Sequence, residues 1–250
     1  MKSHSILEAR GLVKEFRGFT AVDHVDLTVK RGTIHALIGP NGAGKTTCFN
    51  LLTKFIQPTA GSIFFEGADV THDSPTRVAR RGIIRSFQIS ATFPQMSVLE
   101  NIRVALQARA GIAYDFFHSS RRLERFDARC LDYLRRVGLA ELAHQPAYGL
   151  AYGRKRALEI ATTMAMEPSL MLLDEPTQGM GHEDVASITE LIREAAKSCT
   201  VLMVEHNMDV VSRIADTITV LQFGQIIAEG DYGEVSRNPR VLEAYMGVAA

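Results

Sequence analysis

A glycine-rich octapeptide near the N-terminus has the residue types and spacing of a phosphate-binding loop. Residues 39–46 read Gly-Pro-Asn-Gly-Ala-Gly-Lys-Thr and match G-x-x-x-x-G-K-[ST] at every defined position. Glycines let the backbone wrap closely around an anion and turn successive N–H groups toward phosphate oxygens. Lys45 supplies a positive charge for the β- and γ-phosphates, and the Thr46 hydroxyl is a ligand for Mg²⁺. The pattern therefore predicts a nucleoside triphosphate site.

Two carboxylates follow a short apolar run in the second half of the chain. The run Leu170–Leu173 leads directly into Asp174 and Glu175. A carboxylate at the C-terminal end of a strand can reach Mg²⁺ beside the phosphates, and a second one can orient or deprotonate an attacking water. Taken alone, these acids could form an ordinary turn before Pro176. The phosphate loop upstream favours the functional interpretation.

Three further side chains are weaker candidates, because each type more often has a structural role. His206 follows the apolar run Val201–Val204, where a neutral imidazole could bond a γ-phosphate or a water. Gln88 follows another apolar stretch and could ligate Mg²⁺ or hold a water. Phe16 precedes the loop and could stack on adenine, or it could pack in the core. None of the three identifies a site without the others.

These residues need strands and helices to hold them together. An apolar run at 33–38 precedes the glycine-rich loop, and residues 46–55 read as a helix. Strand signals also occur at 22–29, 62–65, 170–173, 200–204 and 218–223, and the last has a hairpin partner at 225–228. Strand, loop and helix in this order are typical of an α/β fold. The same order is the context that a phosphate loop requires.

The middle of the chain has few strand signals between Val98 and about Gly138. Apolar side chains recur there at three- and four-residue spacing, which predicts an amphipathic helix: Leu123, Phe126, Cys130, Leu131, Leu134 and Val137. Arginines in this stretch alternate with acids, which favours a solvated helical surface over a nucleic-acid site. The tail, residues 239–250, reads as one short helix. We therefore predict an α/β core that is split by a helical lobe.

Composition narrows the class of protein. The chain of 250 residues can bury a sizeable core, and its 28 basic and 28 acidic residues give a formal net charge of zero. That balance argues against a nucleic-acid footprint over the whole domain. The three cysteines form no metal-type pair. No apolar run approaches the roughly 20 residues of a membrane-spanning helix, and no secretory signal is expected. Any work at a membrane is expected to proceed through a partner.

Taken in order, these motifs resemble those of the ATP-binding subunits of ABC transporters. The deciding stretch, residues 150–161, reads Leu-Ala-Tyr-Gly-Arg-Lys-Arg-Ala-Leu-Glu-Ile-Ala and is similar to the L-S-G-G-Q signature with its following helix. The resemblance covers essentially the whole chain. It implies a P-loop NTPase (RecA-like) α/β core with an N-terminal antiparallel β subdomain and an inserted α-helical lobe. The expected boundaries are 1–92 and 162–235 for the core with its β subdomain, 93–161 for the helical lobe that carries the signature, and 236–250 for a C-terminal helical tail.

The resemblance also implies a role for each site residue. Glu175 would polarise the attacking water, His206 would sense the γ-phosphate, and Lys45 and Gln88 would complete the catalytic set. Mg²⁺ would be bound by Thr46 and Gln88, with Asp174 acting directly or through water. The expected ATP contacts are Phe16, Gly39, Pro40, Asn41, Gly42, Ala43, Gly44, Lys45, Thr46, Thr47, Gln88 and Asp174, with Ala151, Tyr152, Gly153 and Arg154 reaching the ATP of a partner subunit.

Three positions depart from the family pattern. Ala151 replaces the usual signature serine, so one hydroxyl contact to the γ-phosphate is missing. Arg154 stands where glutamine is usual. Gly181 stands where the loop after Glu175 usually ends in aspartate, and it cannot make that side chain's contacts across a dimer. These departures put the geometry of the dimer and the rate of hydrolysis in question.

Within the family, the chain is most similar to the branched-chain amino acid uptake ATPases. The likeness rests on Asn50 after the phosphate loop, Tyr152 in the signature, residues 204–208 and residues 243–247. It implies uptake of branched-chain amino acids or a similar small polar solute at the cytoplasmic face of the inner membrane. The implied partners are a second ABC ATPase subunit, identical or not, two membrane permease subunits and, indirectly, an extracytoplasmic solute-binding protein, but no nucleic acid.

Two other functions stay open. A regulatory cassette with impaired hydrolysis would explain Ala151 and Gly181. A soluble ABC ATPase that is not tied to transport is the second possibility, although such proteins typically carry a long coiled coil or two cassettes. This chain has one cassette and no sustained heptads.

Overall fold

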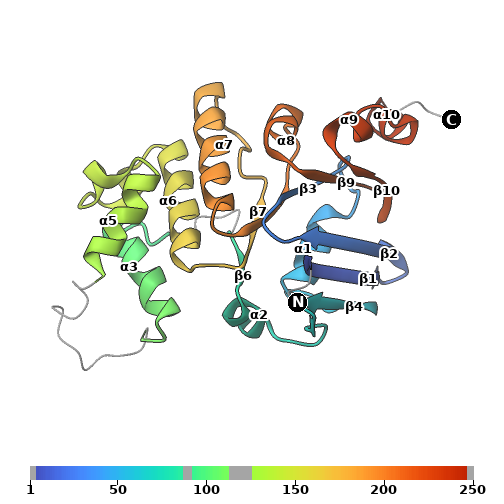
Figure 1. Ribbon diagram of the computed structural model, residues 1–250, viewed down its shortest axis with the longest axis horizontal. Helices are drawn as coiled ribbons and strands as arrows, with labels where there is room; N and C mark the ends of the chain where they lie inside the picture. The colour runs from blue at the N-terminus through green and yellow to red at the C-terminus, as the bar shows by residue number, and fades with distance from the viewer. Residues whose placement is uncertain (1–3, 87–91, 113–125, 247–250) are drawn as a thin grey trace.

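A six-stranded sheet forms the centre of the molecule (Figure 1). The computed structural model describes residues 4–86, 92–112 and 126–246. Across the sheet the order is β10-β9-β3-β8-β7-β6, in which only β10 is antiparallel to its neighbour. The strands are β3 (Ile34–Ile38), β6 (Ile83–Arg85), β7 (Leu170–Asp174), β8 (Thr200–Val204), β9 (Thr217–Gln222) and β10 (Gln225–Gly230). Because β3, β7 and β8 are buried on both faces, their sequences are largely apolar, as predicted.

A second, antiparallel sheet lies beside the first, with the order β2-β1-β4-β5. Its strands are β1 (Ser5–Phe16), β2 (Phe19–Lys30), β4 (Ala60–Phe65) and β5 (Ala68–Asp69). Strand β1 was not predicted from the sequence. Its pairing with β2 shifts register at several points, including between Ala9 and Leu12, and such bulges break the alternation that marks a strand.

Helix α1 (Lys45–Leu52) lies between the two sheets. Its Phe49 and Leu52 share one buried cluster with Leu27 of the antiparallel sheet and Leu202 of the central sheet. The helix was predicted to reach residue 55 but ends earlier, and the hydroxyl of Thr53 donates to the Phe49 carbonyl at 2.7 Å. This packing fixes the start of α1, and with it the loop that precedes the helix.

The opposite face of the central sheet is covered by helices α6 (Tyr152–Ala165), α7 (His182–Ala196) and α8 (Met208–Ile214). Successive residues of β7 and β8 point to opposite faces, so each strand contributes to both hydrophobic clusters. The short helix α2 (Pro75–Arg81) precedes β6, which is the edge strand of the central sheet opposite β10. These layers bring the C-terminal ends of β3, β7 and β8 to one edge of the sheet.

Helices α3 (Val98–Arg109), α5 (Asp127–Arg136) and α6 pack together as a helical lobe, at the left in Figure 1. A capping box of Ser97 and Glu100 begins α3. The predicted amphipathic helix corresponds to α5, whose Cys130 and Leu134 are buried, while residues 113–125 lie outside the described part of the chain. Two 3₁₀ turns, Ala140–Leu142 and Ala147–Gly149, lead into α6.

Two helices follow the last strand, although the sequence predicted one. Helix α9 (Tyr232–Val235) is a single turn that begins with a capping box of Asp231 and Glu234, and α10 (Pro239–Met246) follows it. The predicted tail helix corresponds to α10. Among the described helices, none combines the length and the hydropathy that crossing a membrane would require.

Candidate functional site

The glycine-rich loop connects β3 to α1, and at two of its glycines there is no room for a side chain. Gly39 and Gly44 both have positive φ angles, of 149° and 99°. A Cβ atom would lie 2.1 Å from the Leu221 carbonyl oxygen at Gly39 and 2.4 Å from the Ala21 carbonyl oxygen at Gly44. The backbone of the neighbouring strands therefore packs directly against the loop, and only glycine fits at these two positions.

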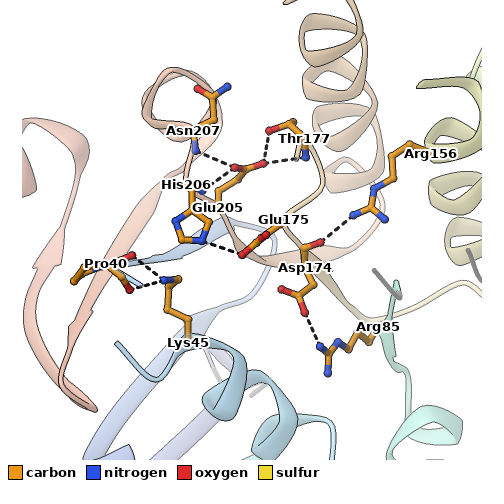
Figure 2. Close-up of polar contacts among 11 residues, drawn as sticks. Pro40, Lys45, Arg85, Arg156, Asp174, Glu175, Thr177, Glu205, His206 and Asn207 are labelled. Atoms are coloured by element: carbon orange, nitrogen blue, oxygen red, sulfur yellow. Dashed lines mark hydrogen bonds and ion pairs between the residues drawn. The ribbon is translucent and has the colours of Figure 1, made fainter. Parts of the chain in front are cut away.

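Lys45 is the first residue of α1 and is almost completely buried. Its Nζ donates to the carbonyl oxygens of Gly39 and Pro40 at 2.8 and 2.9 Å, so the loop closes around the ammonium group (Figure 2). Burial lowers the pKa of Lys45, and the nearby carboxylates of Glu175 and Asp174 oppose that shift. A positive charge is therefore held at the centre of the loop.

The N-terminus of α1 adds to this positive field. Its N-cap is Gly44, which has no side chain to accept from the first-turn N–H groups, and the first turn contains no acid. Thr46 is exposed there and Thr47 is half-buried. Backbone donors at a helix start need acceptors, and a phosphate group suits both their geometry and the helix dipole. The residues present therefore fit a bound nucleotide phosphate.

Asp174 ends β7 and is buried, as the sequence predicted for a carboxylate at a strand terminus. Its Oδ2 accepts from Nη2 of Arg85 at 2.5 Å, and Arg85 ends the neighbouring strand β6. Arg85 also donates to Oδ1 of Asn50 on α1 at 2.6 Å. Arg85 was not among the predicted site residues, and Asn50 had no predicted role in the site. In the sequence, Arg85 is a charged residue at the end of an apolar stretch, three positions before Gln88, which does not distinguish it from a surface arginine.

Glu175 and His206 meet at the ends of adjacent strands. Nε2 of His206 lies 2.9 Å from Oε1 of Glu175 (Figure 2). The Glu175 backbone has a φ of 45°, an uncommon conformation for a residue other than glycine, and its N–H donates to the Val204 carbonyl at 2.9 Å. The pairing of β7 with β8 therefore brings together two side chains that are 31 residues apart in the sequence.

Glu205 joins the two loops that follow β7 and β8. Its buried carboxylate accepts from the N–H and the hydroxyl of Thr177 at 3.1 and 2.5 Å, and from the N–H groups of His206 and Asn207 at 2.8 and 3.0 Å. Figure 2 shows these contacts on both sides of the carboxylate. No sequence signal indicated this role, because an acid next to a histidine is ordinary at the surface.

Arg156 of α6 reaches the same loop from the side of the helical lobe. Its guanidinium donates to the carbonyl oxygens of Asp174 and Pro176 at 2.9 and 3.2 Å, and to the Glu159 carboxylate at 2.7 Å. All of these groups are buried, Pro176 included. The helix that begins with the signature therefore also supports the backbone on either side of Glu175.

The signature residues form the N-terminus of α6. Ala151 is the N-cap and has no side chain that can accept a hydrogen bond. Tyr152 is 60% exposed and donates its hydroxyl to the Gln178 carbonyl at 3.2 Å. Gly153 is buried against Asp184 of α7, whose Oδ1 would lie 2.4 Å from a Cβ atom there. Arg154 is exposed.

For the remaining predicted residues, Phe16, Gln88 and Gly181, the structure gives fewer contacts or none. Phe16 ends β1, pairs with Phe19 in the hairpin and is 43% exposed; the hairpin leads to Ala21, which abuts the phosphate loop. Gln88 lies outside the described residues, so its roles stay predictions. Gly181 is the N-cap of α7 and makes no side-chain cap.

Comparison with known proteins supports the interpretation of these motifs. Residues 22–178 match the family model described as ABC transporter, and residues 225–250 match the model described as branched-chain amino acid ATP-binding cassette transporter. The high-affinity branched-chain amino acid transport ATP-binding proteins LivG of Salmonella typhimurium and BraF of Pseudomonas aeruginosa are 38% and 37% identical. In both comparisons 99% of this chain and 100% of the relative are covered.

The fold leads to the same family. An ATP-binding cassette of an ABC transporter, solved in its ADP conformation, superposes with a TM-score of 0.84 at 29% identity and covers 98% of this chain and 100% of its own. The predicted fold class, a P-loop NTPase core with an antiparallel β subdomain and a helical lobe, is confirmed. The chain belongs to the ABC transporter family, as one of its ATP-binding, ATP-hydrolysing cassettes.

Proposed function

We propose that this chain hydrolyses Mg²⁺–ATP to energise the uptake of branched-chain amino acids, or of a similar small polar solute, through a membrane permease. The observation that carries the proposal is the meeting of Lys45, Asp174, Glu175 and His206 at one edge of the central sheet. The relatives named for branched-chain amino acid transport, and the matching C-terminal segment, support the solute class.

The loop and the start of α1 would hold the phosphates. The N–H groups of Asn41–Thr47 would donate to the phosphates, and Gly39 and Gly44 let the loop pass close to the neighbouring strands. The ammonium of Lys45, fixed by two loop carbonyls, would neutralise the β- and γ-phosphates. Adenine would stack on Phe16, which is exposed at the end of the hairpin beside the loop. Catalysis of this type depends on positioning and on charge stabilisation.

The residues at the strand ends also fit Mg²⁺. The described residues contain no group of three or more His, Cys, Asp or Glu that could hold a metal by themselves. Mg²⁺ typically uses one or two protein ligands together with substrate phosphates and water. Thr46 and Asp174, with Gln88 from the segment outside the described residues, would supply those protein ligands. When bound, the ion would neutralise the charge that develops on the phosphates during transfer.

Glu175 would orient and polarise the attacking water. Its contact with His206 restrains the carboxylate, and its backbone is fixed by the hydrogen bond to Val204. His206 would contact the γ-phosphate from the adjacent strand end, so it would link the presence of that phosphate to the position of Glu175. A carboxylate within hydrogen-bond reach of the water is the expected general base.

The signature would complete the site of a second cassette. Its residues Ala151–Arg154 are largely exposed at the N-terminus of α6, where the helix dipole favours an anion. In a head-to-tail dimer this terminus would face the γ-phosphate held by the partner. The second cassette could be identical to this chain or different from it.

The permease would contact the helical lobe and the groove beside it. A cavity of 260 Å³ there is lined by apolar side chains, among them Phe55, Val78 and Ile84, and Phe55 is 51% exposed. We place the core and its β subdomain at 1–92 and 162–235, the lobe at 93–161 and the tail at 236–250. The chain would work at the cytoplasmic face of the membrane, attached through the permease and served indirectly by a solute-binding protein.

The test uses the Glu175→Gln variant and the assembled transporter. The variant should bind ATP and form a stable dimer that elutes earlier in size-exclusion chromatography, with turnover reduced at least about 100-fold. Near-normal ATPase activity in this variant would refute the role of Glu175. In proteoliposomes with the permease, labelled leucine should accumulate with ATP and fail to do so with the variant. Uptake of another small polar solute instead would correct the solute class alone.

One rival function has a specific observation in its favour. Ala151 and Gly181 provide no side-chain cap at the starts of α6 and α7, the two helices beside the shared site. A regulatory cassette with impaired hydrolysis would tolerate both. Steady-state ATPase activity of the assembled complex decides: activity that disappears when only the partner cassette is inactivated favours the regulatory function.

A further inference from the structure

Arg85 occupies a largely buried position between the predicted metal ligand Asp174 and α1, the helix that follows the phosphate loop. Its side chain is 11% exposed and that of Asp174 is 3% exposed, and the two form an ion pair at 2.5 Å. They come from the C-terminal ends of the paired strands β6 and β7. An arginine here is not required by the phosphate-loop chemistry, so its presence needs an explanation.

The guanidinium is held on several sides. Nη1 donates to Oδ1 of Asn50 at 2.6 Å, and Asn50 lies on α1, the helix that begins at Lys45. The rings of Phe49 and Phe55 each lie 5.8 Å from the guanidinium carbon, within the range of a cation–π interaction. A planar fork that is fixed in this way presents its N–H groups in one geometry.

We propose that Arg85 is a positioning residue for Asp174 in Mg²⁺ binding. By occupying Oδ2, it fixes the rotation of the carboxylate and directs Oδ1 toward the metal or its bound water. By bonding Asn50 at the same time, it sets the distance between that carboxylate and α1, which carries Thr46. The inference rests on the proposed Mg²⁺ site of Thr46 and Asp174. Partners that orient a metal ligand typically contribute 10–100-fold in metal affinity.

A purely structural role would have a different signature. If the ion pair served only to hold β6 against β7, its loss would weaken the folded chain and affect nucleotide binding equally with and without metal. If it positions Asp174, its loss should affect the metal-dependent part alone. Binding measured with and without Mg²⁺ therefore separates the two roles, independently of hydrolysis.

The experiment measures binding of a fluorescent ATP analogue to the purified full chain in the Glu175→Gln background, across a Mg²⁺ titration and in EDTA. Arg85→Gln should raise the half-saturating Mg²⁺ concentration about tenfold, while affinity in EDTA changes less than about twofold. Arg85→Lys, which keeps the charge but loses the fork, should show a smaller rise. Arg103→Gln is the matched control, because Arg103 pairs with Asp127 at 2.7 Å in the helical lobe, and it should leave the titration unchanged.

Two outcomes would overturn the proposal. One is an unchanged Mg²⁺ titration in both Arg85 variants while Asp174→Asn shifts it. The other is a loss of affinity in EDTA as large as the loss in Mg²⁺. If Asp174→Asn itself has no effect, the Mg²⁺ site has failed rather than the role of Arg85. Should Arg85→Gln not fold, as judged by thermal unfolding, Asn50→Ala takes its place with Arg85→Lys, and unchanged titrations in both would refute the positioning role.

Discussion

Arg156 is expected to have two separable roles: its ion pair with Glu159 stabilises the fold, and its contacts with backbone carbonyls support the position of Glu175. Both side chains are 8% exposed and lie 2.7 Å apart on α6. Removing one partner of a buried pair costs about 3–5 kcal/mol, because the other charge stays buried without compensation. Arg156→Met should therefore lower the free energy of unfolding by about 3–5 kcal/mol in urea titrations at neutral pH.

The size of this loss should depend on pH. Burial raises the pKa of the Glu159 carboxyl above its ordinary value of 4.5, and the hydrogen bond and charge of Arg156 oppose the shift. Without Arg156 the folded-state pKa rises further, so the folded chain retains a proton that the unfolded chain releases. Stability is then lost as pH rises above about 4.5. The deficit relative to the parent chain should be smaller at pH 5 than at pH 8.

A double variant isolates the second role of Arg156. Arg156→Met with Glu159→Met removes both charges at similar volume, which is often neutral or stabilising for a buried pair. The contacts to the carbonyls of Asp174 and Pro176 remain lost, and these carbonyls lie on either side of Glu175. We therefore expect stability near that of the parent chain, but ATPase activity at least about tenfold lower, since small displacements of catalytic groups are costly. Recovery of full activity would refute the support of Glu175 by Arg156, and a loss below about 1 kcal/mol in the single variant would refute the pair's energetic role.

Three further predictions concern burial, capping and loop shape. Burial, followed by the charge of Lys30, lowers the pKa of His35 to about 4 from 6.5, so the unfolded chain binds more protons and stability falls as pH drops through 6.5 toward 4. His35→Gln should remove about 2 kcal/mol of the loss between pH 7 and pH 5 in urea titrations. Ala151→Ser supplies an N-cap oxygen to α6 and should raise the unfolding temperature by about 2 °C, with higher ATPase activity. Gly44→Ala forces a methyl group against the neighbouring carbonyl at a positive φ and should weaken equilibrium binding of ATP more than about tenfold.

Each of these predictions has a clear contrary result. An unaltered pH dependence in His35→Gln would mean that another group accounts for the acid sensitivity. If Ala151→Ser changes neither the unfolding temperature nor the turnover, the missing serine is without consequence in this chain. Gly67 also has a positive φ but no atom within 4 Å of a Cβ position, so Gly67→Ala is the matched control for Gly44. Equal losses of ATP binding in both glycine variants would attribute the effect to backbone strain rather than to the shape of the loop.

The central strands were predictable because a strand that is buried on both faces has a short apolar run as its sequence. Strand β8 has the predicted bounds of 200–204, and β7 extends one residue further than predicted. Strand β1 has neither an apolar run nor a regular alternation, because its register shifts place buried and exposed residues irregularly. The end of α1 was misplaced for a related reason: Lys54 adopts a φ of 63°, which ends the helix, and nothing in the apolar pattern announces that angle.

The site also contains residues that were predictable from the sequence and residues that were not. Lys45, Asp174, Glu175 and His206 follow strands or lie on the loop, so the order of a parallel sheet brings them to one edge. Arg85 could not be found in this way, because its partner Asp174 lies 89 residues further along the chain and an isolated arginine is indistinguishable from a surface residue. Glu205 and Arg156 escaped notice for the same reason. Their roles depend on backbone atoms of distant loops, which sequence patterns do not describe.

Helix α6 contacts its own site and carries the residues that would face a second one. Arg156 holds the backbone on either side of Glu175, while Tyr152 at the helix start donates to the carbonyl of Gln178 in the same loop. Only glycine fits at position 153, because a Cβ atom there would clash with Asp184 at the start of α7. A displacement of the signature therefore moves at least two anchors of the loop that carries Glu175. In the proposed dimer, contact of the signature with the partner's γ-phosphate would set the position of Glu175, which makes each site sensitive to the nucleotide in the other.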